Sequence, residues 1–120
     1  MVHAAHQASM PSVSVQSAHE LMQQGVPMID VREPAEIAEL SVPGTIRVPL
    51  GEIEREGAAA LARCGILPGE GGPVLMFCRS GNRSGIATRL LTPAFGARVV
   101  NVEGGVLAWA EHQLPLERGR

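Results

Sequence analysis

The stretch from Pro73 to Thr88, PVLMFCRSGNRSGIAT, constrains the fold more than any other part of the chain. Its apolar run VLMFC has the length of one strand and is typical of a strand buried on both faces of a parallel sheet. A helix should follow within a few residues, capped by Ser84 and with an apolar face formed by Ile86, Ala87, Leu90 and Leu91. Cys78 therefore lies at the carboxyl end of a buried strand, facing a helix start, where α/β proteins place their chemistry.

Strands and helices alternate along the rest of the chain. Periodicity and turn residues predict strands within residues 13–15, 26–31, 42–48 and 97–102, and helices within residues 17–24, 35–40, 50–64 and 106–112. Ser17 and Glu20 have the spacing of a capping box, Gly57 interrupts the third helix, and Trp109 is expected in the core. This alternation predicts an α/β fold with an open, mostly parallel sheet and helices on both faces.

The 120 residues have the size of a single domain. We expect residues 1–11 to be a flexible tail in which His3 and His6 have no role, residues 12–116 to be the folded domain, and residues 117–120 to be a second tail. A net charge of −2 gives no reason to expect nucleic acid or a membrane surface as partner. Neither a signal peptide nor a run of ~18 apolar residues is present, so we expect a cytoplasmic protein.

The two cysteines, Cys64 and Cys78, do not form a disulfide framework, and no Cys/His spacing suggests a metal site. No cofactor is expected. Cys64 falls on the apolar stripe of the helix predicted at residues 50–64, which favours a buried structural cysteine. Cys78 is different, because two Arg, two Gly and a helix start lie within a few residues of it.

These neighbours predict that Cys78 is a nucleophile. A thiol reacts as its thiolate, and both a helix amino terminus and nearby Arg side chains lower its pKa. If the loop wraps around the sulfur, with Gly81 permitting a strained turn, successive N–H groups point inward and form an anion nest. We therefore predict Cys78 as the catalytic residue of a substrate-binding cradle formed by Arg79, Ser80, Gly81, Asn82, Arg83 and Ser84.

The length of this loop discriminates between chemistries. Protein tyrosine phosphatases and related arsenate reductases use Cys-x5-Arg, whose wider cradle takes a tetrahedral oxyanion. Here four residues separate Cys78 from Arg83. The shorter loop leaves room for a single additional sulfur on the thiolate.

Four further residues are weaker candidates for the site. Asp30 ends a neighbouring strand and could reach the loop backbone or pair with an Arg, and a structural role is favoured. Arg32 and Glu33 are expected to form a local ion pair. Gly104 and Gly105 either let a loop pass close to the cysteine or form a helix-entry turn.

The sequence resembles the rhodanese family of single-domain sulfurtransferases. The loop CRSGNRSG looks like the rhodanese active-site loop, and three more motifs occur in family order: IDVREP from Ile29, PGTIRVPL from Pro43 and VEGGVLAW from Val102. Together they cover residues from about 13 to 115. Many members carry Gly-His-Ile before the Pro-Gly turn, whereas this chain has ELSV from Glu39.

The resemblance implies a double displacement. Cys78 thiolate would take the sulfane sulfur of a donor such as thiosulfate, and an acceptor thiol or cyanide would remove it from the resulting persulfide. Arg79 and Arg83 would hold or steer the anionic donor, and a sulfur-relay protein is a possible partner. Two alternatives stay open: a rhodanese-like binding or regulatory domain, although such members usually lack the cysteine, and a phosphatase or arsenate reductase.

Overall fold

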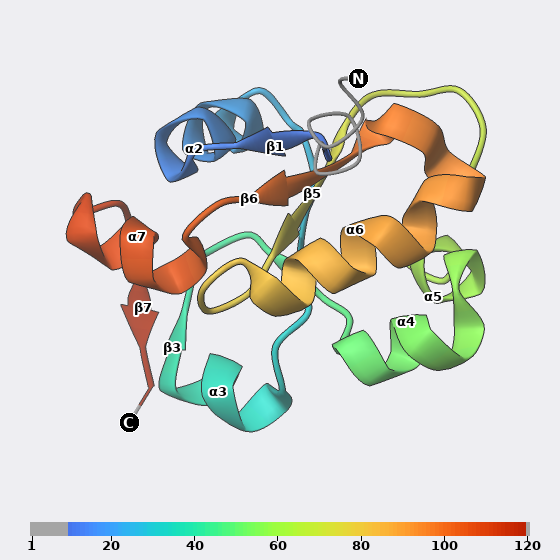
Figure 1. The fold of residues 1–120 in the computed structure, drawn as a ribbon. Coiled ribbons are helices and arrows are strands. Elements are labelled where there is room, and N and C mark those ends of the chain that lie inside the picture. Colours follow the sequence, from blue (N-terminus) through green and yellow to red (C-terminus); the bar gives the residue numbers. More distant parts are fainter. Residues whose placement is uncertain (1–9, 120) are drawn as a thin grey trace, which may run out of the picture.

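A parallel sheet of five short strands forms the centre of the molecule (Figure 1). The structure is a computed structural model and describes residues 10–119. The strand order is β1-β6-β5-β2-β4, and every pairing in this sheet is parallel. The strands are β1 (Ser12–Val13), β2 (Met28–Asp30), β4 (Ile46–Arg47), β5 (Val74–Phe77) and β6 (Val99–Val102). The predicted α/β class is confirmed.

The middle strand, β5, is buried along its whole length. Its side chains alternate between two core clusters: Val74 and Met76 pack on one face of the sheet, and Leu75 and Phe77 on the other. Cys78 follows directly and continues the alternation on the first face. The prediction of a strand buried on both faces is confirmed.

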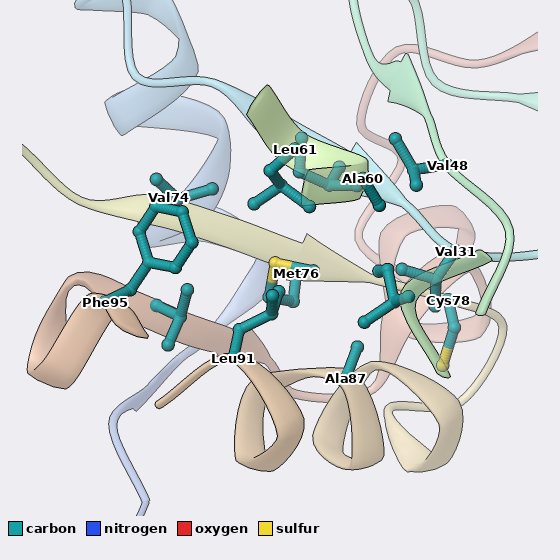
Figure 2. Close-up of a cluster of buried hydrophobic side chains, with 13 residues drawn as sticks. Val31, Val48, Ala60, Leu61, Val74, Met76, Cys78, Ala87, Leu91 and Phe95 are labelled. Carbon is teal, nitrogen blue, oxygen red and sulfur yellow. The ribbon is translucent and has the colours of Figure 1, made fainter. Parts of the chain in front are cut away.

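The first face of the sheet is covered by α4 (Leu50–Glu56), α5 (Ala58–Ala62) and α6 (Asn82–Phe95). Figure 2 shows Met76 between side chains of α5 and α6, with Cys78 and Val31 at one end of the same cluster. Gly57 adopts φ +58° and divides α4 from α5, at the interruption that the sequence predicts.

The second face is covered by α2 (Val15–Gln23) and α7 (Gly105–Glu111). Trp109 of α7 is fully buried, stacks edge-on against Phe77 with ring centroids 5.6 Å apart, and donates its indole N–H to the carbonyl oxygen of Pro115. The prediction that Trp109 lies in the core is therefore confirmed, as are helices on both faces.

A helix and a small second sheet lie at the end of the parallel sheet where Cys78 is found (Figure 1). They are α3 (Pro34–Glu39) and a two-stranded antiparallel sheet of β3 (Leu40–Ser41) and β7 (Glu117–Arg118); a 3-10 turn, η1 (Gly96–Arg98), precedes β6. Residues 117 and 118, which we expected in a tail, are thus paired with β3, and the N–H of Gly119 donates to the carbonyl oxygen of Glu39.

Two predicted helix starts are wrong. Ser14 rather than Ser17 caps α2, because its side chain accepts a hydrogen bond from the backbone N–H of Ser17, so the predicted capping box does not form. Gly81, with φ +100°, is the N-cap of α6, which places Ser84 inside the first turn. A helix start depends on where the backbone leaves the extended conformation, and neighbouring polar residues compete for that position.

The predicted apolar face of α6 is only half right. Ala87 and Leu91 are buried, but Ile86 and Leu90 are 38% and 44% exposed, and Ser84 and Thr88 are buried in their place. Among the described residues, no helix is long and apolar enough to span a membrane. Residues 1–9, with His3 and His6, and residue 120 lie outside the described part of the chain.

Candidate active site

The sulfur of Cys78 lies at the carboxyl edge of the sheet, inside the loop that joins β5 to α6. The residue is buried, and its Sγ accepts a hydrogen bond of 3.0 Å from the N–H of Gly81. The hydroxyl of Ser84, also buried, lies 3.3 Å from Sγ. Chain reversal at Gly81 aims that N–H at the sulfur, since only glycine tolerates φ +100° without strain.

The start of the loop is held by α7. The N–H groups of Val106 and Leu107 donate to the carbonyl oxygens of Cys78 and Arg79, at 3.0 and 3.1 Å. These contacts satisfy amides at the start of α7 and fix the first two carbonyls of the loop. A Cβ on Gly105 would collide with both carbonyls, so the close approach needs glycine here. Both interpretations of the Gly104-Gly105 pair apply: Gly104, with φ +82°, is the N-cap at the start of α7, and Gly105 packs closely against the loop.

Hydrogen bonds set the ionisation of Cys78. Burial of the thiol raises its pKa, but the hydrogen bond from the Ser84 hydroxyl and the N–H groups of Ser84, Gly81 and Ser80 outweigh burial, so the pKa lies below its ordinary value. The thiolate is therefore favoured by fixed donors around the sulfur.

The two loop arginines differ in their surroundings. The guanidinium of Arg83 donates to both carboxylate oxygens of Glu36 in α3, at 2.7 and 2.9 Å. This bidentate pair raises the pKa of Arg83 and lowers the pKa of Glu36 to about 2. Arg79 is exposed, and within residues 10–119 its side chain has no ion pair. Ser80 and Asn82 are exposed beside it.

Asp30 and Arg32 form a buried ion pair next to the loop. The guanidinium of Arg32 donates to both carboxylate oxygens of Asp30, and its Nη2 also donates to the carbonyl oxygen of Leu40. The predicted pair between Arg32 and Glu33 is wrong: the N–H of Glu33 instead bonds to the carboxylate of Glu36 at the start of α3. Asp30 pairs with an Arg and belongs to the scaffold of the site, as the sequence favoured.

Two residues of this region were not predicted. Glu36 binds Arg83, and Asn101 of β6 accepts a hydrogen bond of 2.6 Å from the Ser84 hydroxyl while its amide nitrogen donates to the carbonyl oxygen of Gly81. A lone polar residue in the apolar run VVNV was an available signal for Asn101. No spacing rule indicated Glu36.

The second cysteine is not as expected. Cys64 is exposed, because α5 ends at Ala62 and the chain turns away from the core before the cysteine. Within residues 10–119, no group of three or more His, Cys, Asp or Glu side chains is placed to hold a metal ion.

Comparison with known proteins assigns this chain to a family. A family model described as rhodanese-like domain matches residues 14–112. A sulfurtransferase from Allochromatium vinosum is 36% identical over 93 residues, which are 78% of this chain and 79% of that protein. The chloroplastic thiosulfate sulfurtransferase 16 of Arabidopsis thaliana is 34% identical over 116 residues, which are 92% of this chain and 97% of that protein.

A solved structure with a similar fold is also a sulfurtransferase by name. The human single-domain sulfurtransferase TSTD1 has a TM-score of 0.72 and 28% identity, and the match covers 88% of this chain and 99% of that one. The names of these proteins support a sulfurtransferase activity in general terms. Since the family match spans most of the sequence and both faces of the sheet, the chain belongs to the rhodanese-like domain family.

Proposed function

We propose that the chain moves sulfane sulfur from a donor such as thiosulfate to a thiol or cyanide through a persulfide on Cys78. The environment of the Cys78 sulfur carries this proposal. Its Sγ has fixed donors in Gly81 and Ser84 and a lowered pKa, inside a loop with four residues between Cys78 and Arg83. Such a cradle stabilises a thiolate and fits one additional sulfur.

The reaction has two displacements. In the first, the thiolate attacks the outer sulfur of thiosulfate, a new S–S bond forms at Cys78, the S–S bond of thiosulfate breaks, and sulfite leaves with the electron pair. In the second, an acceptor thiolate or cyanide attacks the outer sulfur of the persulfide, and Sγ leaves as the thiolate. The cysteine is regenerated, the products are an acceptor persulfide or thiocyanate, and no cofactor is required.

We assign different roles to the two loop arginines. Arg79 is exposed and has no ion pair among the described residues, so it is available to contact an anionic donor. Both terminal nitrogens of Arg83 are bound to Glu36, so Arg83 contributes attraction to an anion only in competition with that carboxylate. Ser80, Asn82 and the loop amides complete the donor site.

Persulfide chemistry at an exposed loop suits transfer to another protein as well as to a small thiol. We therefore include a sulfur-relay protein among the acceptors. A free reactive thiol is stable in a reducing compartment, so the proposal places the protein in the cytoplasm.

Intact-mass spectrometry tests the proposal. After incubation with thiosulfate, the wild-type protein and Cys64→Ser should each gain the mass of one sulfur atom, and cyanide should remove it. Cys78→Ser should gain nothing, while Cys64→Ser serves as the matched control because it removes the other thiol. The absence of an adduct with thiosulfate, with organic persulfides and with polysulfide would exclude a Cys78 persulfide. Turnover of an aryl phosphate would favour the phosphatase alternative.

A further inference from the structure

The hydroxyl of Ser84 has one proton and two acceptors within reach. Cys78 Sγ lies 3.3 Å from Ser84 Oγ, and Asn101 Oδ1 lies 2.6 Å from it. A hydroxyl donates one hydrogen bond at a time, so the two contacts cannot both be donated from Ser84. Ser84 is fully buried and Asn101 is 8% exposed, which limits the supply of water as a substitute partner.

The amide of Asn101 is fixed in an orientation that presents its oxygen to Ser84. Its nitrogen donates to the carbonyl oxygen of Gly81 at 3.3 Å, and its backbone N–H donates to the carbonyl oxygen of Pro11. Residue 101 is also in register with Met76 of β5. Because the nitrogen is engaged by the loop, the oxygen remains beside the Ser84 hydroxyl in every state of the sulfur.

The charge on Sγ changes during the proposed reaction. The free thiolate carries its charge on Sγ, which is then a strong acceptor. In the persulfide the charge lies on the outer sulfur, and Sγ becomes a neutral divalent sulfur, which is a weak acceptor. The demand of Sγ for the Ser84 proton is therefore high in one state and low in the other.

We propose that Asn101 is a positioning residue whose Oδ1 accepts the hydrogen bond of the Ser84 hydroxyl whenever Sγ is uncharged, and that the hydroxyl turns to Sγ when Sγ is a thiolate. The proposal rests on the persulfide function and deepens it. In the thiol and persulfide states Ser84 donates to Asn101 Oδ1; in the thiolate state it turns to Sγ. Asn101 thus competes with the thiolate for the hydrogen bond of Ser84 and makes the thiolate less stable. It favours the persulfide, because the buried Ser84 hydroxyl still has an acceptor when Sγ is uncharged.

Removal of the Asn101 oxygen should leave Ser84 with Sγ as its acceptor and so lower the pKa of Cys78, whereas loss of a mere support for the loop would raise it. Asn101→Leu also removes the contact to Gly81, which acts on the pKa independently of Ser84. A double-mutant cycle with Ser84→Ala cancels that part, because it is present in both backgrounds.

The cycle is measured as the pH dependence of alkylation by a neutral reagent, in a Cys64→Ser background so that only Cys78 reacts. The charged side chains on and around the loop are the same in all four proteins: Arg79, Arg83, Glu36, Asp30 and Arg32. The change in pKa caused by Asn101→Leu should be more negative with Ser84 present than with Ala at that position, by about 0.5 to 1 in pKa. A coupling of zero or of opposite sign overturns the proposal.

A second measurement needs no change at Asn101 in the protein that is titrated. The side-chain amide signals of Asn101 in ¹⁵N NMR spectra should move as Cys78 ionises, and most of that movement should be lost in Ser84→Ala, which retains only the direct effect of the charge. Equal movement in the two proteins overturns the proposal even where Asn101→Leu does not fold. Neither measurement uses a sulfur donor, so failure here is distinguishable from failure of the persulfide function.

Discussion

At the scale of single residues, the ionisation of Cys78 depends on hydrogen bonds more than on nearby positive charge. The sequence predicted that Arg side chains and the start of a helix would together lower the pKa of the thiol. In the structure the lowering comes from the Ser84 hydroxyl and three backbone N–H groups, against the opposing effect of burial. Arg83 interacts with the charge of the sulfur, but its guanidinium is bound by Glu36.

This arrangement predicts the effect of Glu36→Gln on donor use. Without the carboxylate, the guanidinium of Arg83 is free to bind an anion, so the KM for thiosulfate should fall roughly threefold, which corresponds to a partly exposed ion pair. Steady-state kinetics with thiosulfate and with an uncharged organic persulfide separate this effect from a general change in activity, because the KM should fall only for the anionic donor. Glu52→Gln is the matched control, because it removes an ion pair that lies outside the loop, between Glu52 of α4 and Arg63 at the end of α5. An unchanged KM would mean that Arg83 does not contact the donor.

The same variant should also change how stability depends on pH. The folded-state pKa of Glu36 is about 2, against an ordinary value of 4.5, because Arg83 donates to its ionised form. A depressed pKa stabilises the fold above pH 4.5, and this contribution is lost as the pH falls from 4.5 towards 2. Urea unfolding should therefore show a smaller loss of stability over this interval in Glu36→Gln, by ~1 kcal/mol or less after allowance for solvent screening.

At the scale of elements, α6 and α7 hold opposite ends of the loop. Gly81 begins α6, and Gly105 begins α7 against the carbonyls of Cys78 and Arg79. Gly105→Ala should displace those carbonyls, lower the free energy of unfolding by roughly 2 kcal/mol, and sharply reduce persulfide formation, because the loop is no longer held in its cradle shape. Denaturant unfolding and intact-mass measurement of the sulfur adduct check both effects.

Gly65→Ala is the control for backbone strain alone. Gly65 also has a positive φ, of +82°, but a Cβ there would meet no atom within 4 Å. It should lose about 1 kcal/mol of stability and keep full persulfide formation. If Gly105→Ala formed persulfide as readily as Gly65→Ala, packing of α7 against the loop would not matter for the site.

The elements also mark what the sequence could predict. The apolar run of β5 and the short loop after it correctly predicted that Cys78 lies at the end of a buried strand. A strand buried on both faces appears in the sequence as a continuous apolar run, which can be recognised without knowledge of the fold. Asn101 could not be tied to Cys78, since the strand order β6-β5 that brings Asn101 beside Ser84 is a property of the sheet. The Arg83–Glu36 pair could not be predicted either, because it joins residues 47 positions apart that only the fold brings together.

At the scale of the whole molecule, the buried pair of Asp30 and Arg32 joins two parts of the fold. Asp30 ends β2 in the parallel sheet, and Arg32 donates to the carbonyl oxygen of Leu40 in β3, the strand that pairs with β7. The side chains of Arg32 and Asp30 are only 4% and 0% exposed. A buried charge that loses its partner is strongly destabilising, whereas removal of both charges costs much less.

We therefore expect Asp30→Ala to lower the free energy of unfolding by about 3–5 kcal/mol, because it leaves the guanidinium of Arg32 buried without its carboxylate. The double variant Asp30→Ala with Arg32→Leu should recover a large part of that loss. Glu52→Ala, which opens an exposed pair with Arg63, should change stability by about 1 kcal/mol or less. Urea unfolding of the four proteins measures these differences. A double variant no more stable than Asp30→Ala would show that the pair is needed as a pair, through its bond to β3, and would contradict the desolvation argument.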